Sequence, residues 1–570
     1  MRLIKARIIL FALIVGLIYI LPHILFIFEE GKDYHLFFKT YEDSQFYAVR
    51  VREAYDGNYL SSDPYIFENK AKPYIRSFLS EYLVGILGRI SGLSIDNLFV
   101  SGDFIFPIII FFLLFYFLLP VVQSEPLSLL GAILIMLAEF PDSLTALIKL
   151  GIPNHFLTFS RPISPQFHYI FFITCLIFIY KSLANGKKGC ILLSGISLGL
   201  LFYAYPYFWI YIFMGSVILY LYLLYKGEFK QIKIILFILA EALIISIPFW
   251  VNYLKLMHLP YYDEIMTRVT FQSSHHIIIP KLSILTLVIF IAFYKKRDFK
   301  FFFLFSFLLG GLLCMNQQVL TGWTFEPEHW HFFVNKQMAV IAGIVLLDRF
   351  LKELRFGEKI ARILLIIGLT FSITVGICTQ VYNYEQKKNM QHTQQNLYGA
   401  FIWLQNNTQK EDVVLASDKI SLLIPIHTHN NVYWSSYIFD YANSDKDILE
   451  RFFLFARLMG MDEKEVVDYV LTHREKGHSD FFGMRYEEPS YKKPDQKANV
   501  KLPQELYDYI IGRYGAFKKE DIKTALMRFR VDYLFYGPNE ELISKGRFKK
   551  ESFLDKVYDS GDIQIYKIIK

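Results

Sequence analysis

The sequence is poor in cysteine and lacks the common nucleotide-binding motifs. Its four cysteines, Cys175, Cys190, Cys314 and Cys378, all lie in or at the edges of apolar runs, so neither a disulfide framework nor a zinc motif is present. No Walker pattern and no dinucleotide fingerprint following a strand occurs in the chain. An enzyme built from this chain that works outside the cytoplasm would therefore need an activated substrate supplied in another form than a soluble nucleotide.

Long apolar runs dominate the chain instead. Hydrophobic residues make up 54% of the 570 positions and the mean hydropathy is +0.31, which excludes a single soluble domain. Many of the runs approach the length of about 20 residues that a helix needs to cross a hydrocarbon core. We expect an α-helical polytopic membrane protein with about eleven transmembrane helices, at Ile8–Phe26, Phe99–Val122, Leu127–Phe140, Phe167–Leu183, Cys190–Ala204, Pro206–Leu224, Ile232–Leu254, Ile278–Tyr294, Phe299–Met315, Met338–Phe350 and Ile363–Tyr382.

Basic residues in the short connections predict the sidedness of the chain. They cluster before the first span, between the fourth and fifth, sixth and seventh, and eighth and ninth spans, and after the tenth. With eleven spans all five clusters share one side, which the positive-inside rule makes cytoplasmic. We expect a protein of the plasma or inner membrane with a cytoplasmic N-terminus, and an uncleaved first span, because no small-x-small cleavage site follows it. Much of the net charge of +7 is then topological, and no nucleic-acid partner is expected.

The composition changes after Tyr382, which predicts two units at residues 1–384, including a long first outer loop at 28–98, and 385–570. A polar connector or the start of an amphipathic helix is expected at 385–396. Beyond it, helical patterns at 397–404, 446–459, 464–472 and 522–529 alternate with strand patterns at 412–416, 431–434, 532–536 and 563–569. This alternation predicts an extracytoplasmic α/β domain.

An acidic pair, Glu42 and Asp43, follows the first span by a short distance and precedes a helical pattern. Acids at this position often only cap the free N–H groups of a helix. At the mouth of a low-dielectric helix bundle, however, a carboxylate can also act as a general base toward an acceptor hydroxyl or amine. The capping and catalytic interpretations both stay open at this stage.

The second outer loop opens at Asp142, on the same predicted side as Asp43, and contains Arg161 and His168. We expect Asp142 to join the catalytic acids, and Arg161 and His168 to bind a lipid phosphate, for which the planar guanidinium is well suited. Snorkelling of Arg161 to the interface, or a purely structural salt bridge, is the alternative.

A further outer loop is dense in amide, imidazole and indole groups. We expect five of its side chains to contact a sugar or phosphate, because aromatic rings stack on sugar faces and amides bond hydroxyls, and we expect Lys336 at its far edge to bind the donor phosphate; the five are Asn316, Gln317, Gln318, His329 and Trp330. An interfacial tryptophan belt would explain Trp330 but not the amides. Metal binding by His329 and His331 has only weak support from their spacing.

With Glu42-Asp43 in the first outer loop, Asp142 opening the second, and the runs at 161–166 and 316–322, the layout resembles the GT-C superfamily of integral-membrane glycosyltransferases. This group includes protein O-mannosyltransferases, the aminoarabinose transferase of lipid A and oligosaccharyltransferase catalytic subunits. The resemblance implies a polyprenyl-phosphate or pyrophosphate sugar donor, with Asp43 or Glu42 as the base and Asp142 as the second-loop acid. The first loop's acidic motif holds no Asp-x-Asp, so Mg²⁺ or Mn²⁺ is only a candidate cofactor and no metal ligands are assigned.

Three functions are consistent with these features. The first is an inverting hexosyl- or pentosyltransferase that moves a sugar from its polyprenyl carrier to a glycan, lipid or protein acceptor. The second is a transporter or flippase of lipid-linked glycans, or a polysaccharide polymerase; a transporter should carry polar groups deep within several spans. The third is a noncatalytic membrane scaffold, in which the acidic residues would not converge around a cavity.

Overall fold

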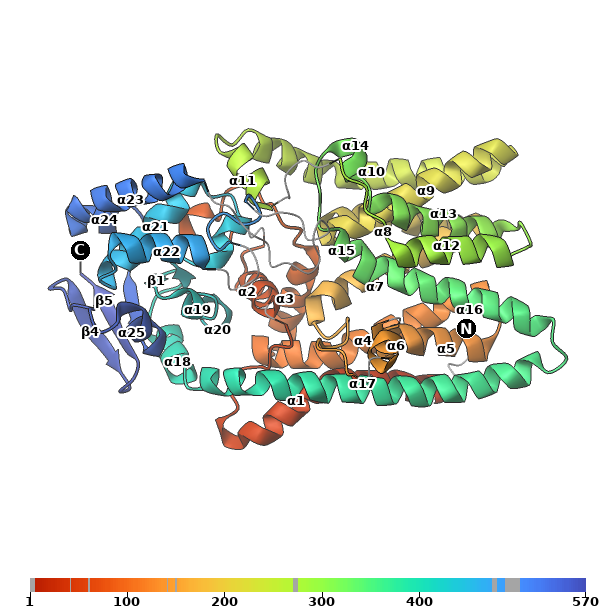
Figure 1. The fold of residues 1–570 in the computed structure, drawn as a ribbon, viewed down its shortest axis with the longest axis horizontal. Helices are drawn as coiled ribbons and strands as arrows, with labels where there is room; N and C mark the ends of the chain where they lie inside the picture. The colour runs from red at the N-terminus through yellow and green to blue at the C-terminus, as the bar shows by residue number, and fades with distance from the viewer. Residues whose placement is uncertain are drawn as a thin grey trace.

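The computed structural model describes residues 6–41, 43–59, 62–140, 142–148, 151–269, 275–473, 479–486 and 503–569. A bundle of long helices forms one end of the molecule and a smaller α/β domain forms the other (Figure 1). The bundle consists of α1 (Ala6–Glu30), α4 (Ile95–Val122), α5 (Glu125–Leu137), α7 (His168–Asn185), α8 (Lys188–Ala204), α9 (Pro206–Lys226), α10 (Phe229–Met257), α12 (Lys281–Phe293), α13 (Phe299–Cys314), α16 (Lys336–Lys352) and α17 (Gly357–Gln395).

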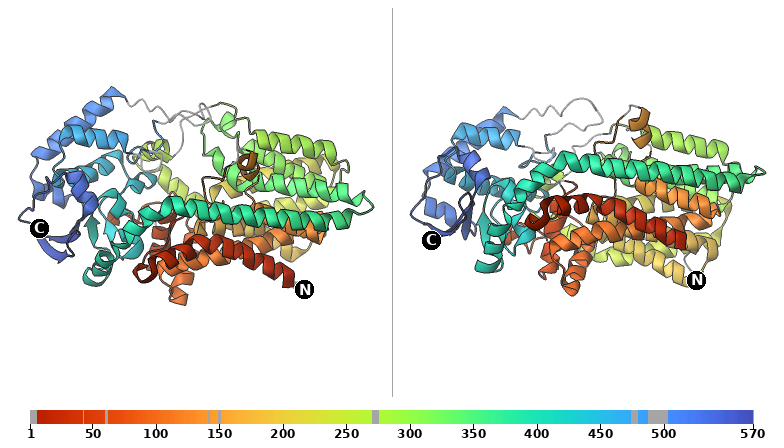
Figure 2. Two further views of the ribbon diagram at one scale, coloured as in Figure 1. Left: turned by 60° about the horizontal axis from the view of Figure 1, so that its bottom comes forward. Right: turned by 90° about the horizontal axis from the view of Figure 1, so that it is seen from below.

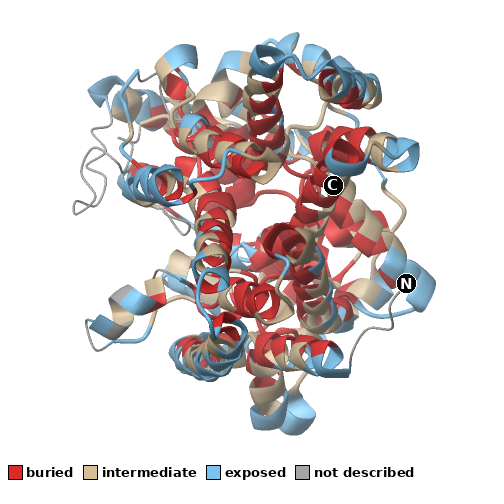
Figure 3. Ribbon diagram, turned by 90° about the vertical axis from the view of Figure 1, so that its right-hand side faces the viewer, coloured by how far each residue is buried: buried red, intermediate tan, exposed pale blue. Residues whose placement is uncertain are grey.

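These helices confirm the polytopic membrane architecture expected from hydropathy. Within the described residues, seven helices are long and apolar enough to cross a membrane, and α5, α8, α12 and α13 are shorter apolar helices. Each of them overlaps one of the expected spans. The outward faces of the bundle are exposed, as the end-on view shows (Figure 3), yet they carry aliphatic side chains such as Ile244 and Ile366, which are 66% and 64% exposed. Exposed aliphatic side chains of this kind are suited to contact lipid. The helix backbone tolerates the hydrocarbon because its hydrogen bonds are satisfied within the helix.

The basic clusters meet at the end of the bundle opposite the α/β domain. Lys300 and Lys352 donate to the carbonyl oxygens of Val121 and Val122, at 2.8 and 3.1 Å. These carbonyls end α4 and are free to accept because the last C=O groups of a helix have no partner within it. Arg349 of α16 lies over the ring of Tyr294, the residue that follows α12, 3.6 Å from its centroid. The clusters therefore share one side, as expected, while the compartment that this side faces stays a prediction.

Short helices lie at the other end of the bundle, most of them between it and the α/β domain. They are η1 (Gly31–Asp33), α2 (Ser44–Tyr55), η2 (Phe67–Asn69), α3 (Leu79–Ser91), α6 (Asp142–Ile148), η3 (Pro162–Phe167), α11 (Tyr262–Val269), α14 (Gln318–Thr321), α15 (Pro327–Trp330) and η4 (His331–Asn335). Most of the candidate catalytic and binding residues lie on these elements or beside them.

The C-terminal domain is built around a five-stranded sheet in the order β2-β1-β3-β5-β4. The first three strands are parallel, and β5 and β4 are added antiparallel. Its elements are α18 (Tyr398–Asn407), β1 (Val413–Leu415), α19 (Asp418–Ser421), α20 (Ile424–His427), β2 (Asn431–Val432), η5 (Ser436–Asp440), α21 (Asp445–Leu458), α22 (Glu463–Thr472), α23 (Gln504–Lys519), α24 (Ile522–Met527), β3 (Tyr533–Tyr536), α25 (Pro538–Ser544), β4 (Leu554–Asp559) and β5 (Gln564–Ile568). The expected α/β class is thereby confirmed.

The predicted connector at 385–396 is the last three turns of α17, which continues without a break from the bundle to the C-terminal domain (Figure 2). The polar residues of this extension hold the first outer loop. Gln395 Oε1 accepts hydrogen bonds from the backbone N–H groups of His35 and Leu36, both at 2.9 Å. The helix changes from apolar to polar here because its partner changes from lipid to protein backbone.

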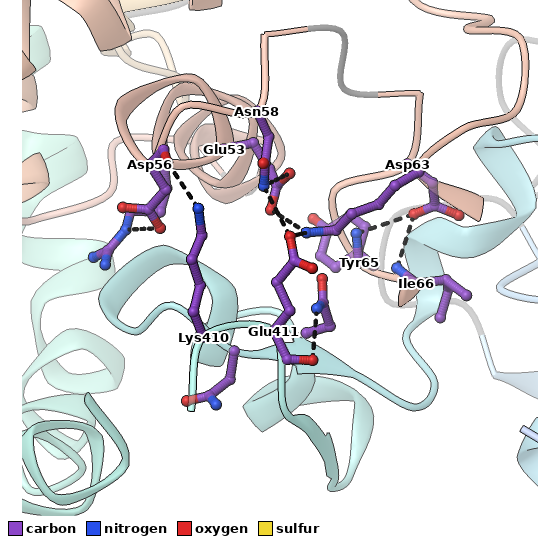
Figure 4. Close-up of polar contacts among 12 residues, drawn as sticks. Glu53, Asp56, Asn58, Asp63, Tyr65, Ile66, Lys410 and Glu411 are labelled. Carbon is purple, nitrogen blue, oxygen red and sulfur yellow. Dashed lines mark hydrogen bonds and ion pairs between the residues drawn. The ribbon is translucent and has the colours of Figure 1, made fainter. Parts of the chain in front are cut away.

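The first outer loop is also bound to the C-terminal domain (Figure 4). Lys70 lies between Glu53 of α2 and Glu411, with Nζ–Oε1 distances of 3.2 and 3.1 Å. The backbone N–H of Val432 in β2 donates to the carbonyl of Tyr65 at 2.9 Å. The loop thus continues the hydrogen bonding of the sheet's edge strand, which an open edge would leave unsatisfied.

A second connection from the bundle, α11, carries the buried residue Arg268. Its guanidinium is 0% exposed, pairs with Asp445, and donates to the carbonyls of Phe439 at 3.2 Å and Asn443 at 2.5 Å. Three C-terminal-domain groups therefore depend on one cation contributed by the bundle.

Single cysteines placed in a background without native cysteines should report the sidedness. Lys296, at the basic end, is 73% exposed, and Lys519 is exposed at the end of α23. A membrane-impermeant maleimide should label Lys519→Cys in intact cells and Lys296→Cys only after permeabilisation, because the positive-inside rule places the basic end in the cytoplasm. The reverse pattern, or labelling of both in intact cells, would contradict the topology.

Replacing Arg268 with Met should lower the stability of the purified protein by about 1–3 kcal/mol, because the carbonyls of Phe439 and Asn443 lose their donor while Asp445 keeps its pairing with Arg485. Thermal unfolding monitored by the loss of soluble, monodisperse protein would measure the change. Arg362→Ala is the matched control, since Arg362 pairs with Glu358 while both side chains are well exposed, at 68% and 75%, and such pairs contribute little. An equal shift for both variants would show that Arg268 is not a structural anchor.

Candidate active site

Asp43 and Arg161 form an ion pair where the first and second outer loops meet. Asp43 immediately precedes α2, but its side chain makes no capping hydrogen bond to the helix. Its Oδ2 instead accepts a hydrogen bond from Arg161 Nη1 at 2.6 Å, and 55% of its side chain is exposed. The capping interpretation is therefore wrong for Asp43, and Glu42 lies outside the described residues.

Arg161 is held by its surroundings as a permanent cation. The guanidinium lies against the rings of Tyr41 and Tyr47, 5.4 and 5.1 Å from their centroids, and Nε donates to the Ser164 carbonyl. Burial works to lower the pKa of Arg161, but the carboxylate of Asp43 outweighs it and raises the pKa above its usual range. Arg161 is only 8% exposed, so its guanidinium does not extend to the membrane interface. Of the two alternatives to phosphate binding, the structure therefore shows the salt bridge and not the snorkelling.

An aromatic wall continues from Tyr47 to Tyr205 and His168. The His168 ring stacks on Tyr205 with centroids 4.8 Å apart and an interplanar angle of 24°. It is 2% exposed, and neither ring nitrogen has a hydrogen-bond partner among the described residues. His168 therefore lies where a phosphate ligand was expected, but it must move or gain a partner to bind one.

His329 joins the same site through hydroxyl and carboxylate groups. Its Nδ1 lies 2.6 Å from the Tyr205 hydroxyl and its Nε2 lies 3.3 Å from Oε2 of Glu326. Tyr207 donates its hydroxyl to the same Glu326 oxygen at 3.0 Å. The contact of His329 with a substrate stays a prediction. Glu326 was not among the expected site residues, although it directly precedes the Pro327-Glu328-His329 run.

The C-terminal domain reaches the site through Asp440 and Tyr437 of η5. Asp440 Oδ1 accepts from Arg76 Nη2 at 2.6 Å. Burial alone would lower the pKa of Arg76, but the nearby carboxylates of Asp440 and Glu326 raise it. Burial and then the negative charge of Asp43 raise the pKa of Tyr437. The three outer loops and the C-terminal domain therefore share one charged region.

A second ion pair joins Asp142, at the start of α6, to Lys336, at the start of α16. The Lys336 side chain is only 4% exposed and that of Asp142 is 35% exposed. Between the two ion pairs lies Glu139, whose Oε2 accepts from the Thr158 hydroxyl at 2.7 Å and whose Oε1 accepts from the Thr158 N–H. Burial raises the pKa of Glu139, and its charge in turn helps to raise the pKa of Tyr41. Sequence reasoning missed Glu139 because it ends an apolar run.

Four of the expected substrate contacts bind parts of the protein in this structure, and whether they also contact a substrate stays a prediction. Asn316 Oδ1 accepts from the Ile278 N–H at 2.8 Å, Gln317 donates to the Trp323 carbonyl at 2.7 Å, and Gln318 donates to the His276 carbonyl at 3.0 Å. Trp330 is 0% exposed and donates its indole N–H to the Tyr207 carbonyl at 2.9 Å. The amides bind backbone because irregular loops leave backbone groups without secondary-structure partners, and the indole fills the core beneath the site.

A buried network inside the outer end of the bundle positions Arg161. His23 of α1 contacts Asp103 of α4 at 2.8 Å, and Gln166 Nε2 donates to the other oxygen of Asp103 at 2.5 Å and to the Phe159 carbonyl. Gln166 therefore ties the segment that carries Arg161 to two membrane helices. Polar groups buried at membrane depth are kept only where they are paired or functional.

The described residues do not offer a ready metal site. Asp43 and Asp142 each bind a basic side chain, and no group of three or more His, Cys, Asp or Glu side chains gathers as ligands in the described ranges. Within the described ranges these residues do not form the oxygen-rich ligand set that Mg²⁺ or Mn²⁺ takes, and a divalent cofactor stays a prediction.

Comparison with known proteins gives structural matches alone. No protein-family model matches the chain, and no curated protein matches it. The oligosaccharyltransferase of Archaeoglobus fulgidus in its apo form matches with a TM-score of 0.46 and 12% identity over 99% of this chain and 74% of that chain. ArnT from Cupriavidus metallidurans in the apo state matches with a TM-score of 0.49 and 11% identity over 97% of both chains.

Replacing Glu139 with Gln should change how stability depends on pH. Because the folded-state pKa of Glu139 is raised above 4.5, the wild-type protein binds more protons folded than unfolded in the window above that value, and its stability falls as pH rises through it. The substituted amide can still accept from the Thr158 N–H and donate to the Thr158 hydroxyl, but it cannot ionise. The Glu139→Gln variant should therefore gain in Tm relative to wild type as pH rises from 4.5 toward neutrality.

Glu139→Ala is the control, because it loses both bonds at every pH and should be less stable throughout by about 1–3 kcal/mol. A Tm difference between Glu139→Gln and wild type that stays constant over this pH window would contradict the burial of an ionisable group at this position.

Proposed function

We propose that this protein is a GT-C-type glycosyltransferase of the plasma or inner membrane. It transfers a hexose or pentose from a polyprenyl-phosphate or pyrophosphate carrier to a glycan, lipid or protein acceptor on the extracytoplasmic side, with inversion at the anomeric carbon. The observation that carries the proposal is the Asp43–Arg161 pair, a half-exposed carboxylate 2.6 Å from a buried, permanently charged guanidinium at the outer end of the bundle.

Arg161 supports the role of phosphate ligand. Its Nε and Nη1 are engaged by Ser164 and Asp43, while Nη2 makes no hydrogen bond within the described part of the chain. This leaves one face of a guanidinium, fixed between two tyrosine rings, for a phosphate oxygen of the lipid carrier. As the bond between the anomeric carbon and that phosphate breaks, the electron pair moves to the phosphate oxygen and the cation stabilises the new charge.

Asp43 supports the role of base. The acceptor hydroxyl attacks the anomeric carbon from the face opposite the phosphate and its proton passes to the Asp43 carboxylate. A single displacement of this kind inverts the configuration.

The remaining site residues supply orientation and charge. His329, Tyr205 and Glu326 present imidazole, hydroxyl and carboxylate groups to the hydroxyls of the transferred sugar. The second pair, Lys336 and Asp142, lies on the bundle side and would bind the phosphate of the carrier as it enters, with His168 between the aromatic rings as a further phosphate contact. The exposed apolar faces of the outer helices contact membrane lipids.

Asp43→Asn tests the proposal because the amide oxygen can still accept from Arg161 while the group can no longer take a proton. Transfer from short-chain polyprenyl-phosphate sugars, offered as a panel of hexoses and pentoses to the purified protein, should fall by a factor of at least about 100. Release of the polyprenyl phosphate measures the rate, and donor binding to the variant should be unchanged.

Asp508→Asn serves as the control, since Asp508 is an exposed acid on α23, outside the site. A transfer rate for Asp43→Asn within a few-fold of the Asp508→Asn rate would remove Asp43 from the chemistry and, with it, the proposed mechanism.

A further inference from the structure

A cavity separate from the Asp43–Arg161 pair lies between α11, the end of α10 and the loop after α14. It has a volume of about 430 Å³ and is lined by Tyr253, Tyr262, Asp263, Met266, Thr267, Thr321, Trp323 and Phe325. Four of these eight side chains are aromatic, and one is an acid. The mechanism proposed above uses none of them.

The loop side of the cavity is built to present Trp323. Gly322 has a positive φ of 76° and reverses the chain after α14, a conformation that favours glycine. The Thr321 hydroxyl accepts from the Trp323 N–H at 3.2 Å, and Gln317 donates to the Trp323 carbonyl at 2.7 Å. These contacts fix the backbone of Trp323, a residue that lines the cavity and is 39% exposed.

The opposite wall is equally ordered. The hydroxyls of Tyr253 and Tyr262 lie 2.9 Å apart, and the Thr267 hydroxyl accepts from Arg485 Nε at 2.9 Å. Arg485 also holds Asp445 of the C-terminal domain. The wall is therefore part of the contact between the bundle and that domain.

The polar groups left over in the cavity match a carbohydrate. Within the described part of the chain, the Asp263 carboxylate makes no ion pair and the Trp323 indole N–H makes no hydrogen bond, while Trp323 and Phe325, which is 38% exposed, offer apolar ring surface. A pyranose ring has an apolar face of C–H groups and a rim of hydroxyls that donate to carboxylates and accept from N–H groups. Asp263 is exposed at the rim of the cavity, where its carboxylate can accept hydrogen bonds from the hydroxyls of a sugar.

The cavity adjoins the reaction centre along the chain. Phe325 directly precedes Glu326, whose carboxylate contacts His329 and Tyr207. We propose that this cavity binds a sugar unit of the acceptor, so that the acceptor of the proposed transferase is a carbohydrate or a glycan-bearing molecule. The inference rests on the proposed function and narrows its acceptor class.

Binding of soluble oligosaccharides to the purified full-length protein tests the inference without any donor. The probes are chitotriose, mannotriose and cellotriose, and the readouts are saturation-transfer NMR and tryptophan fluorescence. At least one trisaccharide should bind the wild-type protein. Trp323→Ala should weaken that binding by about tenfold or more, since a central aromatic contact commonly carries this much of a binding energy.

Trp323→Phe should retain most of the binding seen by NMR but lose the fluorescence change, which assigns the signal to this ring rather than to another tryptophan. Asp263→Asn should weaken binding to a smaller extent. Tyr509→Ala is the matched control, because Tyr509 is an exposed aromatic residue of α23, 47% exposed and distant from the cavity in the fold.

Failure of this inference and failure of the transferase proposal give different results. No binding of any trisaccharide by wild type, or equal binding by wild type and Trp323→Ala, would overturn the carbohydrate site whatever the transfer rate. Trisaccharide binding that survives in Asp43→Asn, together with loss in Trp323→Ala, would support it even if no transfer were found.

Discussion

The structure around the candidate site depends on keeping one cation charged where the membrane bundle ends. Arg161 is buried between Tyr41 and Tyr47, and the Asp43 carboxylate compensates for its loss of hydration. A buried guanidinium without such a partner would be strongly unfavourable. The Gln166–Asp103–His23 network is therefore more than local packing, because it holds the segment on which this cation stands to two helices of the bundle.

The first outer loop connects the helix bundle to the C-terminal domain. Gln395 of α17 holds its beginning, and Lys70 and Tyr65 bind it to the C-terminal domain. Asp43 lies within this doubly anchored segment, so its position is set by the bundle and the domain together. Arg268, reaching from α11 to Asp445, anchors the other side of the same junction.

Hydropathy and basic residues were sufficient to predict the spans and their common basic end, because the composition of a segment decides whether it can lie in the hydrocarbon core. Composition did not reveal parts of the C-terminal domain, because their apolar residues are few or scattered. The strand β4 is an edge strand with mostly exposed or half-exposed side chains, and α23 carries its apolar residues among polar ones. The Asp43–Arg161 contact joins residues 118 positions apart, which no local pattern reveals. Whether the run Asn316-Gln317-Gln318 contacts a sugar stays a prediction, because an amide that binds a sugar and an amide that binds backbone within a loop look identical in sequence. Whether Asp142, His168 and Lys336 bind the donor stays a prediction.

The length of α17 has a consequence for how a substrate must approach. Its 39 residues amount to about 58 Å of helix, against a hydrocarbon core of about 30 Å. Roughly half of this helix therefore extends beyond the acyl chains, and the helix continues without a break to the C-terminal domain. One continuous helix therefore sets the distance between the C-terminal domain and the membrane.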